Sequence, residues 1–326
     1  MRSRLLIATA ALWLGLAAPA AGQSQDNDAP TATLGQRVVA RWRVGMIVTA
    51  EGGAFKRIVG TVTVPMDWPE QTVREVERDL SSGVTVSYRT VEGAARQMVV
   101  SIPSLAAGDD ARAIVTFEIK RLCPSPPENP DLYVLPKVKP ADRRLGAFLG
   151  PSPLIESDDA QIAGIAKKLV AGQDNAWRQV EALYDWVREK IEFHDNRGGT
   201  VKSALQALRD GTGDCDEMTS LFVALCRASD VPARTVRVPG HCYPEFYLLD
   251  DEGKGHWFPC QAAGSRAFGA MPDPRPVLQK GDNLLVVDAQ TKKKTRARFL
   301  PETLAGFPAG RGGALRLKLV CEPADQ

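Results

Sequence analysis

The hydrophobic pattern of this chain changes its period at one proline-rich segment, and that change divides the fold. The segment is Pro124-Ser125-Pro126-Pro127-Glu128-Asn129-Pro130. Because proline lacks the backbone N–H that a β-ladder needs, no strand is expected to continue through it. Apolar residues alternate with polar ones before the segment, whereas after it they recur at helical spacing. The sequence therefore predicts an α+β chain in which a β-rich part precedes a part with helices.

The region before the prolines resembles a set of short strands. Stretches of alternating apolar and polar residues are separated by clusters of Gly, Ser and Asp, a spacing typical of a β-sandwich. These stretches are residues 38–46, 58–64, 84–88, 97–102 and 113–122. We predict an N-terminal β-sandwich-like domain over residues 34–123, with a binding or spacer role and no catalytic residue.

The region after the prolines combines helices with strands. Apolar side chains have helical spacing over 162–169 and 177–191, and a third helix is indicated by Asp214, whose carboxylate can cap it while Glu217 reaches back. Strand-like stretches follow. They are residues 235–238, 241–249, 256–261, 284–287 and 315–320. We expect a proline-rich linker over 124–154, a core over 155–262 in which helices pack on an antiparallel sheet, and C-terminal strands over 263–326 that complete this core.

The first 22 residues have the order of a secretory signal peptide. Arg2 and Arg4 precede the apolar run 5–16, and small residues follow over 17–22. The run is shorter than the roughly 20 residues of a membrane span, although an uncleaved anchor is the alternative. We expect residues 23–33 to be disordered. The sequence thus predicts a secreted or periplasmic protein with no integral membrane segment after cleavage.

Charge and motifs narrow the classes of partner. The chain carries 41 basic and 39 acidic side chains, a net charge of +2, whereas nucleic-acid binding requires a basic face. The run Lys292-Lys293-Lys294 resembles a solvated hairpin tip, with surface anchoring as the alternative. There is no phosphate loop, nucleotide motif or haem motif. We predict no nucleic-acid partner and no cofactor, and the oligomeric state stays open.

Six cysteines in an exported chain raise the possibility of disulfides. With Cys215 as a reactive thiol, at least one more cysteine must stay unpaired. We favour the pairs Cys242–Cys260 and Cys123–Cys321. Cys226 would then remain free inside a helix.

Cys215 lies in the first turn of the helix that Asp214 would cap. A helix N-terminus stabilises negative charge, so the pKa of a thiol there is lowered, and the thiolate is the nucleophilic form. The same N–H groups can receive the oxyanion of a tetrahedral intermediate. Asp214 and Asp216 partly oppose the thiolate, and a cysteine at a helix start can also be purely structural.

His241 begins a strand directly after Pro239-Gly240 and supplies a candidate base. If the following turn centres on Asp251, His241 faces Gln261 and Cys242 faces Cys260, so that Gln261 could orient the imidazole. A register slip of one residue would undo this arrangement.

His241, Cys242, His256 and Cys260 are residue types that can bind zinc. Alternation places His241 on the opposite face from the other three, and His256 lies about 13 Å from Cys260 along an extended strand. We predict no metal site. His194 is expected in a solvent-facing loop.

Three blocks carry a resemblance to a known family. They are Gly213-Asp214-Cys215-Asp216-Glu217 with the helix after it, His241-Cys242-Tyr243-Pro244-Glu245-Phe246, and Trp257-Phe258-Pro259-Cys260-Gln261. Together, over residues 155–262, they resemble the transglutaminase-like superfamily, a circularly rearranged relative of papain-type thiol proteases. The resemblance implies a papain-like core and Cys–His acyl transfer on amide or peptide bonds of a protein or peptide substrate.

The resemblance also assigns roles to single residues. Cys215, His241 and Gln261 would be catalytic, while Trp257, Tyr243 and Asp214 are candidates for substrate binding. The family usually has an acid where this chain has Gln261, although an amide carbonyl can orient the imidazole as Asn does in papain-like sites. We expect hydrolysis rather than cross-linking, since water is always present. The alternative is a non-catalytic binding or scaffold protein of the cell envelope.

Overall fold

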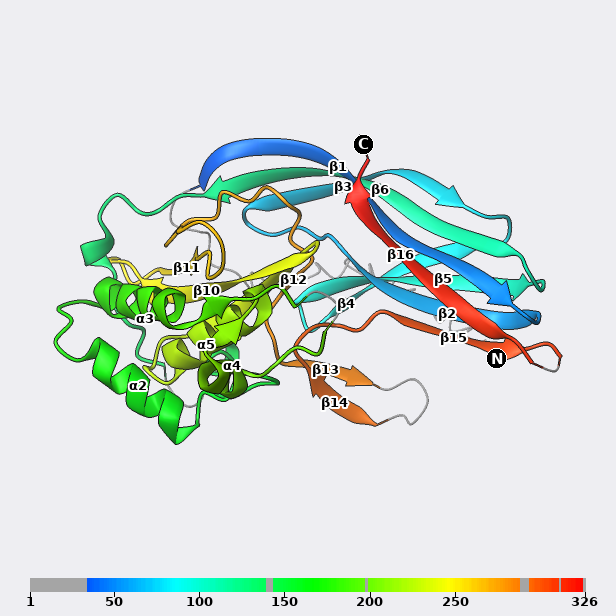
Figure 1. Cartoon of the computed structure of the whole chain (residues 1–326). Coiled ribbons are helices and arrows are strands. Elements are labelled where there is room, and N and C mark those ends of the chain that lie inside the picture. The colour runs from blue at the N-terminus through cyan, green and yellow to red at the C-terminus, as the bar shows by residue number, and fades with distance from the viewer. Residues whose placement is uncertain (1–33, 139–142, 197–198, 288–292, 311, 325–326) are drawn as a thin grey trace, which may run out of the picture.

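A computed structural model describes residues 34–138, 143–196, 199–287, 293–310 and 312–324. The predicted signal peptide and the polar segment 23–33 lie outside the described residues. Figure 1 shows the helices gathered at one end of the molecule and two layers of long strands at the other. The α+β prediction is confirmed, with a strand-rich N-terminal region that precedes a core of helices and antiparallel strands.

Two sheets face each other in the strand-rich part. One has the order β16-β1-β6-β3, and the other contains β4, β5, β2 and β15. Their bounds are β1 Leu34–Glu51, β2 Phe55–Val64, β3 Gln71–Leu80, β4 Thr85–Val91, β5 Ala95–Leu105, β6 Asp110–Pro124, β15 Thr303–Pro308 and β16 Ala314–Pro323. Apolar side chains from both sheets, among them Met46, Ile58, Met98 and Phe117, form one buried cluster. This packing is the reason for the alternation in the sequence.

β3 was missed from the sequence. Its residues QTVREVERDL carry charges at most positions, and most of its side chains are partly or fully exposed. The strand lies at the edge of its sheet and pairs only with β6 among the described strands. Charged residues are common on such edges because they discourage pairing with another chain, and they hide the apolar alternation.

The expectation that residues 263–326 complete the helical core is wrong for the last two strands. β16 pairs with β1 from Trp42↔Pro323 to Glu51↔Ala314, and β15 pairs with β2. Both strands thus return to the N-terminal sandwich, where β1 is long enough to offer a full second ladder. The part of this segment that does belong to the core includes Phe268, which lies in its buried cluster. The short β12 (Gln279–Lys280) joins the core sheet and links β9 to β5, so one sheet runs through both parts.

The core packs helices against the strands β9, β10 and β11. Bounds are α2 Ala160–Val170, α3 Ala176–Lys190, α4 Ala204–Asp210, α5 Cys215–Arg227, β9 Ala233–Val238, β10 His241–Leu249 and β11 Gly255–Pro259. The carboxylate of Asp159 and the amide oxygen of Asn175 cap α2 and α3. Trp177 packs edge-on against Phe246, Phe258 and Phe268, which ties α3 to the sheet.

Shorter elements connect these parts. They are η1 Pro130–Leu132, α1 Arg143–Gly146, β7 Glu192–Phe193, β8 Thr212–Gly213, β13 Leu284–Val287 and β14 Lys294–Ala297. The segment expected to be a linker packs on the core, since Tyr133 is buried and Val134 pairs with Leu249. β13 and β14 form the hairpin expected around the lysine run. Lys292 lies outside the described residues, and Lys294 is exposed.

The β10–β11 hairpin has a register two residues away from the expected one. Glu245 opposes Pro259 and Tyr247 opposes Trp257, so the turn centres on Glu252 instead of Asp251. Asp250 holds this turn because its carboxylate accepts hydrogen bonds from the N–H groups of Glu252 and Lys254. A shift of two residues keeps every side chain on its expected face.

All six cysteines are free, so neither favoured disulfide is present. Cys321 opposes Val44 on β1, whereas Leu122, next to Cys123, opposes Arg37. These positions on β1 are about 23 Å apart at a rise of about 3.3 Å per residue, far too distant for a disulfide. Cys260 is buried in the core beneath the helices, while Cys242 faces the start of α5.

Candidate active site

The start of α5 is fixed by reciprocal hydrogen bonds. The carboxylate of Asp214 accepts from the N–H of Asp216 at 2.7 Å, and that of Glu217 accepts from the N–H of Asp214 at 2.8 Å. Glu217 also accepts from the N–H of Lys202, which anchors the preceding loop. This capping box places Cys215 at the first helical position, in the first turn as the sequence predicted. The side chain of Cys215 is partly exposed.

The pKa of the Cys215 thiol lies well below that of an ordinary cysteine. A hydrogen bond from the thiol of Cys242 lowers its pKa most, and hydrogen bonding and charge from His241 add to this against the effect of burial, giving a pKa of about 5. Cys215 is therefore a thiolate at neutral pH. A thiolate is the form that attacks a carbonyl carbon.

His241 follows a two-residue turn that joins β9 and β10. Val238 pairs with His241, and Gly240 between them has a φ of 66°, a conformation that favours glycine at this position. Nε2 of His241 lies 3.3 Å from Oε1 of Gln261, which leaves the other ring nitrogen for Cys215. Burial lowers the pKa of His241, but contacts with Cys215 and then Gln261 outweigh burial and raise it overall.

Gln261 is held through its backbone. Its carbonyl oxygen accepts from the hydroxyl of Tyr184 at 2.8 Å and from Arg188 at 2.9 Å, and its N–H donates to the carbonyl of Ala267. The side chain is left to face His241. The structure thus brings Cys215, His241 and Gln261 together in one chain of contacts.

Two acidic neighbours were expected to oppose the thiolate, and the structure weakens both. Burial, followed by the hydrogen bond with Glu217, raises the pKa of Asp214 to about 7. Asp216 is paired with Arg298, whose Nη1 lies 2.8 Å from Oδ1 and whose Nη2 donates to the Asp216 carbonyl. The carboxyl of Asp214 is used by the helix cap, so it is not oriented toward a substrate.

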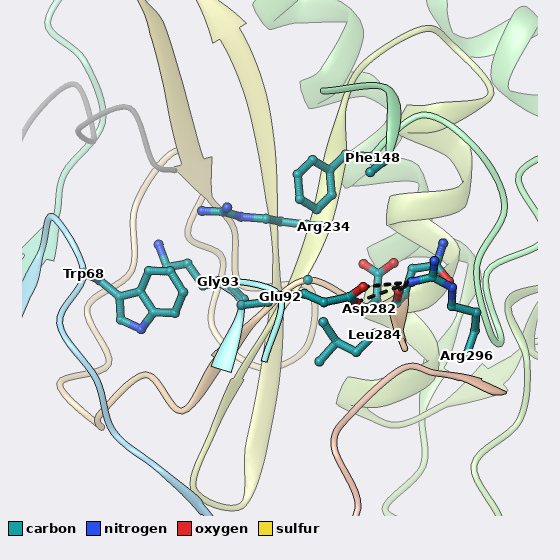
Figure 2. A pocket seen from close by; sticks show the side chains of 13 residues that line it. Trp68, Glu92, Gly93, Phe148, Arg234, Asp282, Leu284 and Arg296 are labelled. Carbon is teal, nitrogen blue, oxygen red and sulfur yellow. Dashed lines mark hydrogen bonds and ion pairs between the residues drawn. The ribbon is translucent and has the colours of Figure 1, made fainter. Parts of the chain in front are cut away.

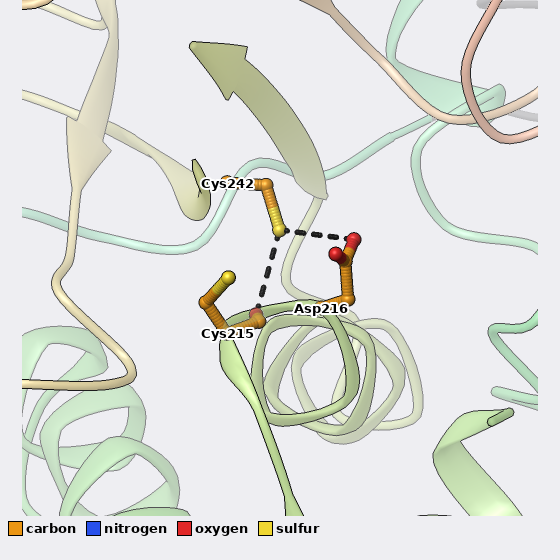
Figure 3. Close-up of side chains that lie close together, drawn as sticks. All are labelled: Cys215, Asp216 and Cys242. Atoms are coloured by element: carbon orange, nitrogen blue, oxygen red, sulfur yellow. Dashed lines mark hydrogen bonds between the residues drawn. The ribbon is translucent and has the colours of Figure 1, made fainter. Parts of the chain in front are cut away.

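The places of Cys242 and Arg298 in this site were not predicted from the sequence. Sγ of Cys242 contacts both Asp216 and Arg298, and Figure 3 shows Cys242 directed at the start of α5, beside Cys215. Strict alternation placed Cys242 on the opposite face from His241. Because His241 is the first residue after the turn, both side chains reach Cys215. Because Cys242 follows His241 directly in the sequence, its place near Cys215 could have been predicted. Arg298 is far from these residues along the chain, so no sequence pattern indicated its contact.

Tyr243 and Trp257 do not have the substrate-binding positions expected of them. Tyr243 is 1% exposed and its hydroxyl accepts from the buried Arg121 at 3.0 Å. Trp257 is 3% exposed and lies beneath the guanidinium of Arg234, 3.9 Å from the ring centroid. Both are structural because other parts of the chain cover their face of the sheet: Tyr243 packs with Trp68 and Met271, and Trp257 packs against Phe148.

The other polar residues considered for the site, His256, Glu245 and His194, lie outside it. Nε2 of His256 lies 2.6 Å from the carboxylate of Asp250, within the β10–β11 turn. Glu245 pairs with Arg234 and Lys280 in a buried network. His194 is exposed, as predicted.

A cavity of about 590 Å³ lies where the N-terminal strands meet the core (Figure 2). Trp68 and Phe148 line it together with Arg234 and Arg296, and Arg296 pairs with Glu92 at its mouth. Cys215, His241 and Gln261 do not belong to this lining in the described part of the chain. Of its cations, Arg234 and Lys280 pair with the buried carboxylates of Glu245 and Glu70, whereas Arg296 and Glu92 form an exposed pair.

Comparison with known proteins identifies the core. Residues 163–262 match the family model of the transglutaminase-like superfamily. This segment is a transglutaminase-like core. The match begins in α2 and ends just after Gln261, so the transglutaminase-like core includes the capped helix α5 and the hairpin that carries His241.

One solved structure supports the same fold. A candidate cysteine protease from Cytophaga hutchinsonii has a TM-score of 0.58 at 17% identity, over 89% of this chain and 93% of that one. Two further structures are a candidate protease from Parabacteroides distasonis and the periplasmic domain of TgpA from Pseudomonas aeruginosa bound to ethylmercury. Their TM-scores are 0.30 and 0.31, at 13% and 11% identity, over 72% and 67% of this chain and 44% and 89% of theirs. Of these three, the Cytophaga hutchinsonii structure shares the fold of this chain.

No curated protein matches the chain. Among the residues that the structure describes, no helix combines the length and apolarity that crossing a membrane requires.

Proposed function

We propose that this protein is an exported cysteine enzyme that acts on amide or peptide bonds by Cys–His acyl transfer, with hydrolysis favoured over cross-linking. One observation carries the proposal. A free thiol with a pKa of about 5 lies at a helix start and interacts with a histidine whose other nitrogen faces Gln261. A perturbed thiol with this pair of partners is typical of nucleophilic catalysis.

The reaction would proceed in two halves. The Cys215 thiolate attacks the carbonyl carbon, and the backbone N–H of Cys215 at the start of α5, which the helix cap does not use, receives the oxyanion. His241 then protonates the leaving amine as the C–N bond breaks, which leaves a thioester on Cys215. Water, deprotonated by His241, attacks the thioester and releases the acid and the thiol.

Gln261 would act as a positioning residue. Its amide oxygen accepts a hydrogen bond from His241 and fixes the ring, but it carries no negative charge. In the resting pair the Cys215 thiolate already balances the imidazolium, so an uncharged acceptor suffices there. An acid would add stabilisation when the thiolate is consumed.

A mixed peptide library tests the reaction class. The wild-type protein is incubated with the library and a primary amine, and cleaved, deamidated and amine-linked products are separated by mass. We expect cleaved or deamidated products in excess over amine-linked ones, and none from Cys215→Ala. Products that persist in Cys215→Ala would overturn the proposal.

Gln261→Ala is expected to lower kcat by about 10²-fold, because a ring that is displaced by roughly 1 Å loses that much in rate. Alkylation of Cys215 should continue, since the thiol keeps its contacts with Cys242 and His241. Gln261→Glu retains an acceptor oxygen and is expected to keep more activity than Gln261→Ala. A Gln261→Ala variant as active as wild type would remove Gln261 from the site.

The non-catalytic scaffold remains the alternative, and the geometry favours the enzyme over it. A scaffold would tolerate a Cys215 that is out of reach of His241 or bound in a disulfide. Cys215 is instead free, and its proximity raises the pKa of His241. Export rests on the sequence of residues 1–22, and we retain it as part of the proposal.

A further inference from the structure

A second cysteine, Cys242, lies beside Cys215 but is more deeply buried. The sulfurs of Cys215 and Cys242 and a carboxylate oxygen of Asp216 all lie within 4.8 Å of one another (Figure 3). Cys215 is partly exposed, whereas Cys242 is only 2% exposed. Burial raises the pKa of Cys242 well above its ordinary value, so this thiol keeps its proton while Cys215 is ionised.

Contacts hold the Cys242 side chain toward the start of α5. Its Sγ lies 3.4 Å from the carbonyl oxygen of Cys215 and 3.4 Å from Oδ1 of Asp216. Nη2 of Arg298, which is also bound to Asp216, lies 3.6 Å from the same sulfur. A guanidinium at this distance stabilises negative charge on Cys242 whenever the thiol loses its proton.

We propose that Cys242 is the resolving thiol of Cys215. After a peroxide oxidises the sulfur of Cys215, Cys242 attacks that sulfur and forms a Cys215–Cys242 disulfide, which a thiol reductant can reverse. Oxidation-prone cysteines are ionised and accessible, and a nearby resolving cysteine is a common companion. This role is separate from acyl transfer and does not depend on it.

The Cys215–Cys242 disulfide would form in two steps. The Cys215 thiolate attacks one peroxide oxygen, the O–O bond breaks, and a sulfenic acid and hydroxide form, so that sulfur loses two electrons and peroxide gains them. The sulfur of Cys242 then attacks the sulfenic sulfur, and the S–O bond breaks as the S–S bond forms. The departing hydroxide takes the proton of Cys242 and leaves as water.

Other cysteines are less suited to the step. Cys226 and Cys260 are fully buried in the core cluster, and Cys123 and Cys321 belong to strands of the sandwich. The sulfurs of Cys215 and Cys242 must close to about 2.05 Å. Each is at the start of its element, Cys215 first in α5 and Cys242 second in β10.

The same three ligand atoms could be considered for a metal ion, but Arg298 argues against it. Its guanidinium occupies Oδ1 of Asp216 at 2.8 Å and adds a positive charge beside the sulfur of Cys242. A cation would meet that charge at close range. We therefore assign the pair to thiol chemistry.

Peptide mapping of the oxidised full-length protein tests the proposal. Wild-type protein is treated with hydrogen peroxide in stoichiometric amounts, blocked with N-ethylmaleimide and digested with trypsin. Peptide 210–227 contains Cys215 and Cys226, and peptide 238–254 contains Cys242 alone. We expect these two peptides to be linked, with fragmentation placing the bond on Cys215, and dithiothreitol to separate them.

Two variants sharpen the test. Cys242→Ser is expected to carry about tenfold more sulfinic acid on Cys215 than wild type, because the sulfenic acid has no resolving thiol. Cys321→Ser, which removes an exposed cysteine elsewhere, should behave as wild type. Absence of the linked peptide in wild type overturns the proposal, whether or not Cys242→Ser folds. The readout is a mass, so a failure of the acyl-transfer proposal would leave it interpretable.

Discussion

A His241→Ala variant is expected to lose about 10⁴-fold in kcat, the upper end of what a positioned acid–base group contributes. The ring exchanges a proton with Cys215 and protonates the leaving amine, and no other described histidine reaches that position. His194 is exposed and His256 is bound to Asp250 in a distant turn. Turnover is measured on whichever peptide the library identifies.

The matched control for this variant is His194→Ala. It removes the same side chain from the surface of the core, and kcat is expected to stay within about twofold of wild type. Circular dichroism and thermal unfolding of both variants should match wild type. A His241→Ala enzyme that keeps most of its turnover would show that the proton is moved by another group.

Asp282→Ala is expected to destabilise the fold by about 3–5 kcal/mol, the usual cost of leaving one partner of a buried ion pair without the other. Asp282 accepts from Nη2 of Arg227 at 2.7 and 2.9 Å, and both side chains are almost fully buried. It also accepts from the hydroxyl of Ser152 and the N–H of Thr235. These contacts join the end of α5 to β9 and to the segment after β12.

Urea unfolding followed by tryptophan fluorescence measures the loss. Asp282→Asn keeps an oxygen acceptor and should lose less stability. Glu322→Ala breaks the exposed pair with Arg43 and should change the free energy of unfolding by at most about 0.5 kcal/mol. An Asp282→Ala protein as stable as Glu322→Ala would contradict the role given to this buried pair.

Local chemistry made much of the fold and site predictable. The alternation in β1, β2, β5 and β6 reports burial on one face, and Asp214 with Glu217 marks the start of α5 correctly. The meeting of His241 with Gln261 also follows from alternation, because side chains on one face stay there when the register shifts by two residues.

Contacts between residues far apart in the chain could not be predicted from the sequence. Nothing in the local pattern of β15 or β16 says that they return to the sandwich, because that choice depends on which sheet edges stay open. Arg298 reaches Asp216 across a long sequence separation, and no local period carries such a contact. The burial of Tyr243 and Trp257 likewise depends on what packs above them.

The most direct test of the account is the pH dependence of Cys215 alkylation. Iodoacetamide is applied at graded pH, and peptide 210–227 reports Cys215 beside Cys226, a buried comparator whose pKa burial raises. Because the pKa of Cys215 is lowered, its thiolate forms as the pH rises through about 5, and the labelling rate should be half-maximal there. His241→Ala should move this midpoint upward. A wild-type Cys215 that reacts only above neutral pH, no faster than Cys226, would contradict the thiolate–imidazole pair.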